Sequence, residues 1–456
     1  MTRANIRKIA LLVFVSRLLT FIVFPKPVYF PDSPGYSNGK FLNFDLVSLS
    51  GQSLRAWPTP LLYSILPNIN FISASQLLIS GLAWFWLILN SVALLNTKRY
   101  QIILLFTMLL FSSSTFLIQW DTVALGTSLL ISTTVLVVAQ LLRVLRNSFN
   151  SIDIGILICL VILLSIEKFS NIPLSIGISI TLIIAAAKQM SKKSIAAISA
   201  FAFIGLSYSI MVGSNVDRSW SGSYSGTTLL WQLGDQSPVA QSFKDFLATK
   251  PEVPPCIYVA APYQDLNSSI GEVLNSCDEG LEYIRLDLQK NFIMFAISHP
   301  FQIVKLSSLG FGAYFTNSAN NYGNAVQITP DTFNSFIFGG TRPSLNSGAI
   351  QDQSEGYSAF NSGEPFWLYV PGLGLLFAGW VTSVANIRRS QNKSIDISIL
   401  AITALLLFQA TITTTFLPSE WVRQLAPYLI PLAAINVLTV VTYFERKSNS
   451  FGNRSI

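Results

Sequence analysis

Charged residues are scarce in this sequence. Only 11% of its 456 residues are Asp, Glu, Lys or Arg, whereas a soluble domain carries about 25%. Hydrophobic residues make up 51%, and the mean hydropathy is +0.51. These values predict an all-α polytopic membrane protein. The net charge of +7 does not indicate nucleic-acid binding, because the basic residues are scattered between apolar runs, as topology signals are.

Histidine and cysteine are also rare. His299 is the single histidine, so no metal cluster or assisted nucleophile can be built from histidines beyond this residue. Of the three cysteines, Cys159 lies in an apolar run and is expected to pack there. Cys256 and Cys277 both lie in the one long polar region. A disulfide between them is expected if that region is outside the cytoplasm, and two free thiols are the alternative.

Nucleotide-binding motifs are absent from the sequence. There is no GxxxxGK[ST] motif and no strand-linked GxGxxG motif. The loops predicted to be cytoplasmic are too short to hold a nucleotide-binding domain. An enzyme of this design is expected to work at the outer membrane surface, on substrates available there.

Long apolar runs, in contrast, are plentiful. A membrane-spanning helix needs about 17–25 apolar residues, and about 10 transmembrane helices are predicted. Their approximate positions are 8–24, 71–95, 102–118, 123–142, 154–168, 171–187, 195–213, 366–387, 397–416 and 425–444. The first run is predicted to be a retained anchor, because it lacks a small-residue cleavage site.

The basic residues predict the orientation of these spans. With ten spans, six clusters fall on one side, which the positive-inside rule makes cytoplasmic. The clusters are Arg3, Arg7 and Lys8; Lys98 and Arg99; Arg143 and Arg146; Lys188, Lys192 and Lys193; Arg388, Arg389 and Lys393; and Arg446, Lys447 and Arg454. Both termini are then cytoplasmic.

The chain is therefore predicted to have three parts. Residues 1–213 form an N-terminal transmembrane module with an outer loop at 25–70. Residues 214–365 form an extracytoplasmic region of mixed structure, and residues 366–456 form C-terminal transmembrane helices. Within the middle part, 292–316 is predicted to be an amphipathic helix on the outer membrane surface, with a re-entrant segment as the alternative.

Two carboxylates are candidates for chemistry. Asp32 lies between Pro31 and Pro34, in a stiffened loop just after the first span. It could serve as a general base or hold a metal, and an ordinary turn is the alternative. Asp121 lies in the outer turn between the third and fourth spans, with helix capping as the alternative. Two acids at the same membrane depth, on separate elements, suit base and metal-binding or acceptor-binding roles.

Basic residues near the outer surface are candidates for binding a lipid phosphate. Arg423 lies in the last outer turn, and its alternative is a local pair with Glu420. Lys168 is a second candidate unless it pairs with Glu167, and Arg55 is a weaker third. Arg17, inside the first span, is either functional or held by snorkelling or a neighbouring partner.

These features together resemble the GT-C superfamily, whose polytopic glycosyltransferases use polyprenyl-phosphate-linked sugars. Protein O-mannosyltransferases and lipid A aminoarabinose transferases belong to it. The resemblance rests on Asp32-Ser33-Pro34-Gly35-Tyr36, Trp57-Pro58-Thr59-Pro60-Leu61-Leu62-Tyr63, Asp121, Ser298-His299-Pro300, and Arg423 with Pro427 and Pro431. It covers the N-terminal third and the C-terminal tail.

The resemblance implies transfer of a sugar, with inversion, to a cell-envelope glycan, lipid or protein. Asp32 would be the general base and Asp121 a second catalytic acid. Donor and acceptor contacts would come from Tyr36, Trp57, Tyr63 and His299. A divalent metal is possible as a cofactor, and the implied location is the bacterial plasma membrane.

Three other functions fit parts of the pattern. An O-antigen-type polymerase or ligase also has many spans and a large outer loop. A lipid or glycan transporter would show inverted repeats and broken helices, neither of which is clear here. A non-catalytic scaffold would leave Asp32 and Asp121 exposed and far apart.

Overall fold

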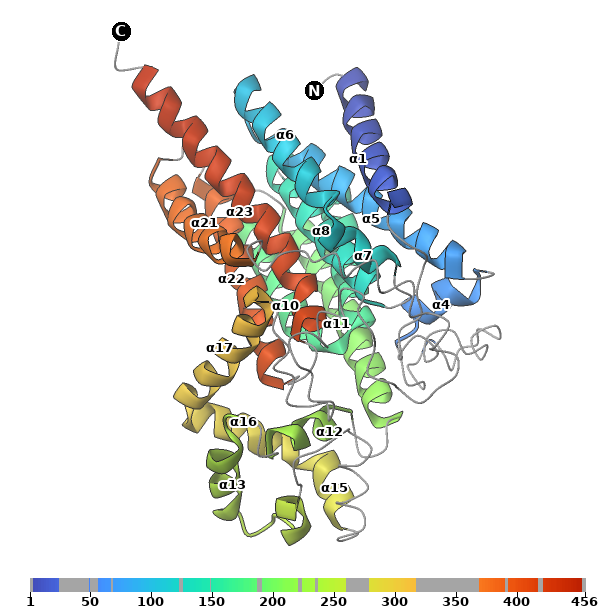
Figure 1. Cartoon of the computed structure of the whole chain (residues 1–456), viewed down its shortest axis with the longest axis vertical. Coiled ribbons are helices and arrows are strands. Elements are labelled where there is room, and N and C mark those ends of the chain that lie inside the picture. The colour runs from blue at the N-terminus through green and yellow to red at the C-terminus, as the bar shows by residue number, and fades with distance from the viewer. Residues whose placement is uncertain are drawn as a thin grey trace.

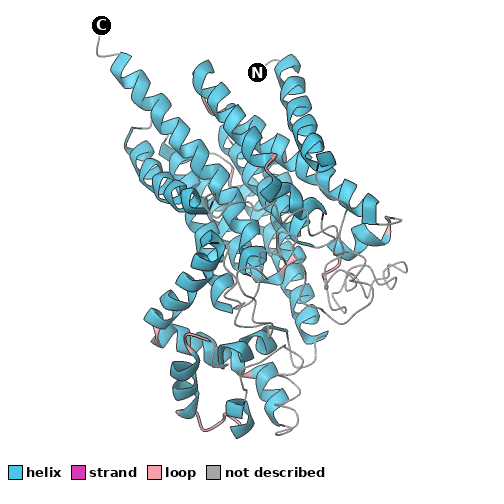
Figure 2. Ribbon diagram, viewed as in Figure 1, coloured by secondary structure: helices cyan, strands magenta, loops and turns pink. Residues whose placement is uncertain are grey.

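The computed structural model of the chain describes residues 3–23, 49, 56–66, 69–122, 126–147, 149–186, 191–219, 224–233, 237–259, 279–316, 369–389, 393–416 and 421–452. In these ranges every regular element is a helix and no strand occurs (Figure 2). The mixed structure predicted for the extracytoplasmic region is therefore wrong for its described part. Apolar helical periodicity there, rather than alternation, sets the fold.

Long helices occupy each of the predicted apolar runs. They are α1 (Arg3–Val23), α5 (Ile69–Val92), α6 (Lys98–Ser112), α8 (Gly126–Arg146), α9 (Ser151–Glu167), α10 (Ile172–Ala186), α11 (Lys192–Ser219), α21 (Tyr369–Arg389), α22 (Lys393–Phe416) and α23 (Trp421–Gly452). Three short elements join them: α4 (Pro58–Ser64), α7 (Thr115–Thr122) and the 3₁₀ helix η1 (Phe169–Asn171).

Five helices in the described part of the chain are long and apolar enough to cross a membrane. They contain the segments Asn70–Val92, Gly126–Arg146, Lys192–Asp217, Ile395–Phe416 and Gln424–Ser450. A shorter apolar helix covers Phe169–Ala185. A helical membrane protein follows from these lengths, because an apolar helix satisfies all its backbone groups internally.

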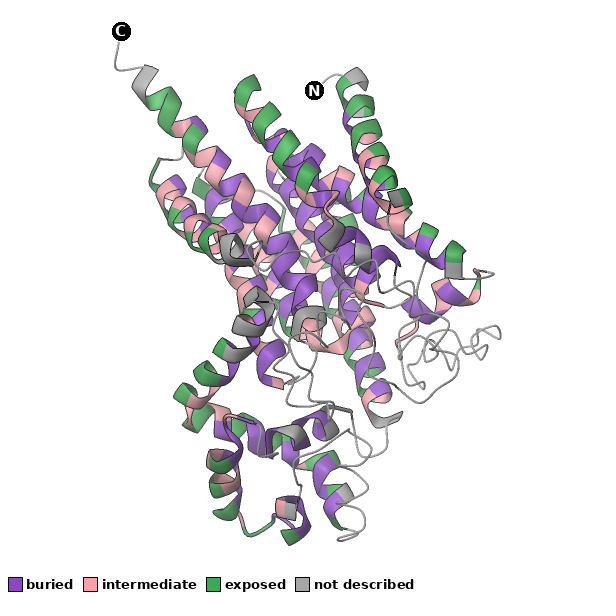
Figure 3. Cartoon of the chain, viewed as in Figure 1, coloured by how far each residue is buried: buried purple, intermediate pink, exposed green. Residues whose placement is uncertain are grey.

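The long helices form one bundle with α8 at its centre. Helices α5, α9 and α23 pack around α8, and nearly all of α8 is buried (Figure 3). Helix α23 also packs on α21 and α22. The start of α1 and the end of α23 lie at the same end of the bundle (Figure 1).

Charged groups fasten this end of the bundle. Arg143 pairs with Asp153 at 2.7 Å, and Arg446 pairs with Asp396 at 2.9 Å. Both carboxylates lie in the first turn of a helix, where the helix dipole stabilises a negative charge. Glu445 accepts hydrogen bonds from the backbone N–H groups at the loop before α6. Sequence-distant helices are thus joined at their ends.

A second helical layer lies beyond the opposite end of the bundle (Figure 1). It contains α12 (Tyr224–Leu230), η2 (Trp231–Leu233), α13 (Ala240–Ala248), η3 (Pro255–Val259), α15 (Glu279–Leu286) and α16 (Leu288–Ser298). Its core is a separate apolar cluster centred on Phe243, Phe292 and Phe295, whose rings are 5.0–6.0 Å apart. The helices of this layer come from the long polar region of the sequence, 214–365.

The predicted surface helix over 292–316 is wrong as a single element. The structure divides it into α16 and α17 (Pro300–Thr316), with His299 between them at φ −128° and ψ 59°. Pro300 lacks an N–H group and disfavours helical geometry at the preceding residue, so the helix breaks there. Helix α17 then packs against α21, α22 and α23.

Candidate functional site

Several predicted site residues lie outside the described part of the chain. These are Asp32, Tyr36 and Arg55, together with Cys277. Arg423 lies in the first turn of α23, but its side chain is not described. Cys256 is buried in the core of the second helical layer, and its pairing with Cys277 stays a prediction. The site is therefore built from the remaining residues.

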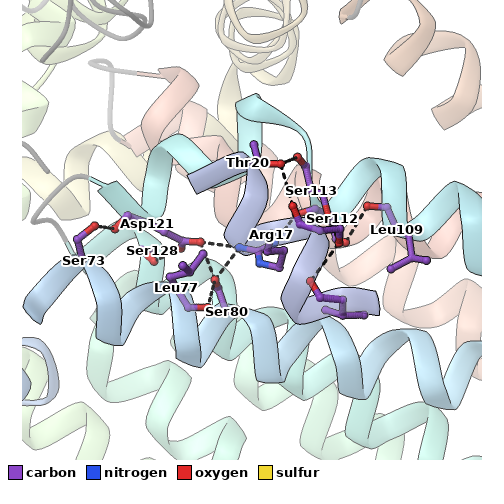
Figure 4. Close-up of polar contacts among 12 residues, drawn as sticks. Arg17, Thr20, Ser73, Leu77, Ser80, Leu109, Ser112, Ser113, Asp121 and Ser128 are labelled. Carbon is purple, nitrogen blue, oxygen red and sulfur yellow. Dashed lines mark hydrogen bonds and ion pairs between the residues drawn. The ribbon is translucent and has the colours of Figure 1, made fainter. Parts of the chain in front are cut away.

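The buried charges Arg17 and Asp121 form an ion pair inside the bundle (Figure 4). Arg17 Nη2 lies 2.5 Å from Asp121 Oδ2, and the two residues are 1% and 2% exposed. Arg17 also donates to Ser80 Oγ at 2.7 Å and to the backbone carbonyl of Ser112. The pair therefore joins α1 to α5, α6 and α7.

Serine hydroxyls complete the coordination of Asp121 (Figure 4). Ser80 donates to Oδ2 at 2.6 Å, and Ser128 donates to Oδ1 at 2.7 Å. Ser73 donates to the backbone carbonyl of Asp121 at 2.8 Å. Both carboxylate oxygens thus have partners from the helices around them. This geometry suits a residue that holds helices together, because buried charges need a cation and hydrogen bonds.

A second group of polar residues lies at the end of the bundle nearest the second helical layer, where η1 follows α9. Glu167 ends α9, and its Oε1 accepts a hydrogen bond from Thr133 Oγ1 at 2.9 Å. Lys168 follows in extended geometry, at φ −151° and ψ 111°. Its Nζ donates to Oε1 of Gln424, in the first turn of α23. The two neighbours thus point to different helices, Glu167 to α8 and Lys168 to α23.

Three predicted site residues meet in this region. Lys168 contacts the residue that follows Arg423, so these two candidate phosphate ligands lie on adjoining elements. Trp57 precedes α4 and packs in the apolar cluster around Ile166, next to Glu167 in the chain. We call the group Glu167, Lys168, Gln424 and Trp57 the outer site, where "outer" refers only to the end of the bundle nearest the second helical layer.

Buried polar atoms continue from the outer site into the bundle. Tyr428 donates to Asn171 Oδ1 at 2.5 Å, and Gln409 Nε2 donates to the backbone carbonyl of Ser170 at 2.7 Å. Glu167 Oε2 and Gln409 Oε1 are buried without a hydrogen-bond partner, and the side chains of Ser170, Gln409 and Thr413 lie within hydrogen-bonding reach of the Tyr428 hydroxyl. Buried polar groups normally have partners, so this cluster has unused hydrogen-bonding capacity.

Two predicted contact residues lie away from the outer site. Tyr63 is buried in α4 and accepts a hydrogen bond from Gln76 Nε2 at 2.9 Å. His299 stacks on Phe295 with 4.7 Å between ring centroids, and its Nδ1 is 2.8 Å from Ser298 Oγ. His299 thus supports the junction between α16 and α17.

Sequence reasoning missed several parts of these sites. It left Arg17 without an identified partner and gave no role to Thr133, Gln409 or Gln424. The available signal was polar residues within apolar runs, which need buried partners. No group of three or more His, Cys, Asp or Glu able to hold a metal occurs in the described ranges.

Comparisons with known proteins do not assign the chain to a family. No family model, no curated protein and no solved structure matches it at a significant level. The functional assignment therefore depends on the residues and geometry described above.

Proposed function

We propose that the protein is a GT-C-type glycosyltransferase. It moves a sugar from a polyprenyl-phosphate-linked donor to a cell-envelope glycan, lipid or protein acceptor. The membrane character of the helical bundle and the polar outer site support this proposal. The sequence motifs around Asp32, Trp57 and Arg423 supply the resemblance on which it rests.

One observation carries the proposal: Lys168 is hydrogen-bonded to Gln424 at the start of α23. Arg423 precedes Gln424, so two basic residues belong to adjoining elements at one end of the bundle. The first turn of a helix also presents free N–H groups and a partial positive charge. A phosphate attached to a membrane-embedded chain suits this combination.

The proposed reaction is a direct displacement with inversion. Asp32 takes the proton from an acceptor hydroxyl, and the hydroxyl oxygen attacks the anomeric carbon. The bond from that carbon to the phosphate oxygen breaks, and polyprenyl phosphate leaves with the electron pair. Lys168, Arg423 and Arg55 offset the negative charge that develops on the leaving phosphate.

The same proposal includes the finer topology. Ten spans, cytoplasmic termini and a location in the bacterial plasma membrane put the outer site on the side where polyprenyl-linked sugars are used. The second helical layer is then extracytoplasmic. A disulfide between Cys256 and Cys277 suits that oxidising side.

Donor turnover tests the proposal. Reconstituted protein is offered polyprenyl phosphates carrying different hexoses and pentoses, together with crude envelope acceptors. We expect the wild type to consume one donor, Asp32→Asn to lose turnover, and Lys168→Met to bind polyprenyl phosphate more weakly. Glu445→Gln, at the other end of the bundle, is the control and keeps activity.

Other outcomes favour other functions. Equal turnover by wild type and Asp32→Asn would move catalysis away from Asp32 and weaken the resemblance. No turnover of any donor by folded protein would overturn the proposal in favour of a polymerase or a transporter.

A further inference from the structure

We propose that Glu167 binds a hydroxyl group of the donor sugar, and that it, rather than Asp121, is the second acidic residue of the substrate site. This inference rests on the proposed function and identifies a further substrate-binding residue in the outer site. It depends on how differently the structure treats the two carboxylates.

Both oxygens of Asp121 already accept hydrogen bonds. Its Oδ2 is bound by Arg17 and Ser80, and its Oδ1 is bound by Ser128. All three partners are buried. Asp121 is therefore suited to holding helices together, and its carboxylate is already satisfied without a substrate.

Glu167 is bound on one side only. Thr133 holds Oε1 at 2.9 Å and thereby fixes the carboxyl group, while Oε2 is buried without any hydrogen-bond partner. A carboxylate oxygen is a strong acceptor, and an unfilled one in a buried position is costly to the fold. A ligand hydroxyl that donates to Oε2 would satisfy it.

The neighbours of Glu167 indicate which ligand brings that hydroxyl. Lys168, the next residue, is a candidate phosphate ligand, and it is hydrogen-bonded to Gln424 in the first turn of α23. Trp57 packs against the apolar cluster to which Ile166, the residue before Glu167, belongs. A sugar phosphate presents a phosphate and hydroxyl groups a few bonds apart. Glu167 faces α8 and Lys168 faces α23, and these two helices pack against each other. The acceptor and the cation can therefore contact two separate groups of one such ligand.

Other buried polar groups lie nearby. Gln409 Oε1 is also unpartnered, and Ser170 and Thr413 lie beside the Tyr428 hydroxyl. Ser170 lies on η1, which follows Glu167 and α9, and Gln409 and Thr413 lie on α22. A ligand with several hydroxyl groups can therefore find more than one partner here, whereas a bare alkyl phosphate finds only the cationic part.

Binding measurements separate the sugar contact from the phosphate contact. The probes are a polyprenyl phosphate without sugar and polyprenyl phosphates carrying mannose, glucose or arabinose, titrated into protein in lipid nanodiscs. For Glu167→Gln we expect about ten- to hundredfold weaker binding of the preferred sugar-linked probe. Binding of the sugar-free probe should not change. Lys168→Met should weaken binding of both probes.

Glu445→Gln is the matched control, because it makes the same chemical change in a buried glutamate at the opposite end of the bundle. It should bind every probe as the wild type does. Equal binding of the sugar-linked probe by wild type and Glu167→Gln would overturn the assignment and leave the proposed function intact. Failure of the wild type to bind any probe would overturn both.

A measurement on the wild type alone covers the case in which Glu167→Gln does not fold. The preferred donor is compared with analogues that each lack one sugar hydroxyl. One analogue should bind about tenfold or more weakly, because it lacks the hydrogen bond to the carboxyl group of Glu167. Uniform binding of all analogues would overturn the proposal.

Discussion

Arg17 and Asp121 depend on each other, because each is almost completely buried among apolar helices. Removing one partner leaves an uncompensated charge, which costs about 3–5 kcal/mol of stability. We therefore expect Arg17→Met to lower the free energy of unfolding by about that amount. The double variant Arg17→Met with Asp121→Leu should be more stable than Arg17→Met alone. Unfolding by SDS in mixed micelles measures both effects.

Arg143→Met is the control for this prediction. Arg143 also pairs with a buried aspartate, but its own side chain is 32% exposed, and Asn147 holds the other oxygen of Asp153. Its removal should therefore cost less than the removal of Arg17. A similar loss for Arg17→Met and Arg143→Met would show that burial does not set the strength of the inner pair.

Tyr283 is expected to make the stability of the second helical layer depend on pH in the alkaline range. It is buried and accepts a hydrogen bond from Asn291 Nδ2 at 2.8 Å. Burial raises the pKa of Tyr283 to about 12, from about 10 in an unfolded chain. Below about pH 10 both states keep the proton, and between about pH 10 and 12 only the folded state keeps it. Stability is therefore lost as pH rises through this window.

Tyr283→Phe tests this dependence because phenylalanine cannot ionise. The stability of Tyr283→Phe relative to wild type should increase when the pH is raised from about 9 to about 11. Thermal unfolding at the two pH values measures the difference. A constant difference would mean that Tyr283 titrates alike in the folded and unfolded chain.

Helices α21 and α23 approach closely at Gly379. A methyl group added at Gly379 would lie 2.2 Å from Asn436 Oδ1 and 2.6 Å from Asn436 Cβ. Either helix must then move, at a cost of about 1–3 kcal/mol. We expect Gly379→Ala to lower the unfolding midpoint, measured by loss of helix signal on heating.

Gly374 on the same helix is the control. A methyl group there meets nothing within 4 Å. Alanine is also a better helix former than glycine, so Gly374→Ala should leave the midpoint unchanged or slightly higher. Equal losses at both positions would show that helix packing at Gly379 is looser than described.

The elements were more predictable from the sequence than the contacts between them. Apolar runs contain their own signal, and each became helical, although the run 102–118 is divided after Ser112 between α6 and α7. The break at His299 was harder, because Pro300 follows an apolar pattern that continues on both sides. The partners of Arg17 and Glu167 come from helices distant in the chain. Sequence spacing does not reveal which helices are neighbours, so Thr133 and Gln424 could not be assigned.

At the scale of the whole molecule, two sets of polar residues lie at the two ends of one bundle, apart from the pair Arg17 and Asp121 inside it. The end that holds the start of α1 and the end of α23 is fastened by Arg143, Asp153, Asp396 and Arg446. The other end holds the outer site and the second helical layer (Figure 1). The proposed function requires the second end to face outward, so the orientation of the chain is a direct test.

Helix α11 connects the two ends and makes this test simple. It runs from Lys192 through an apolar segment that ends at Asp217, and α13 follows in the second helical layer. Lys192, at the start of α11, and Gln241, on α13, are both exposed. In a Cys159→Ala background, we expect a membrane-impermeant maleimide to label Gln241→Cys on intact cells. Lys192→Cys should react only after permeabilisation. The reverse pattern would place the outer site in the cytoplasm, where polyprenyl-linked donors of the proposed kind would not reach it.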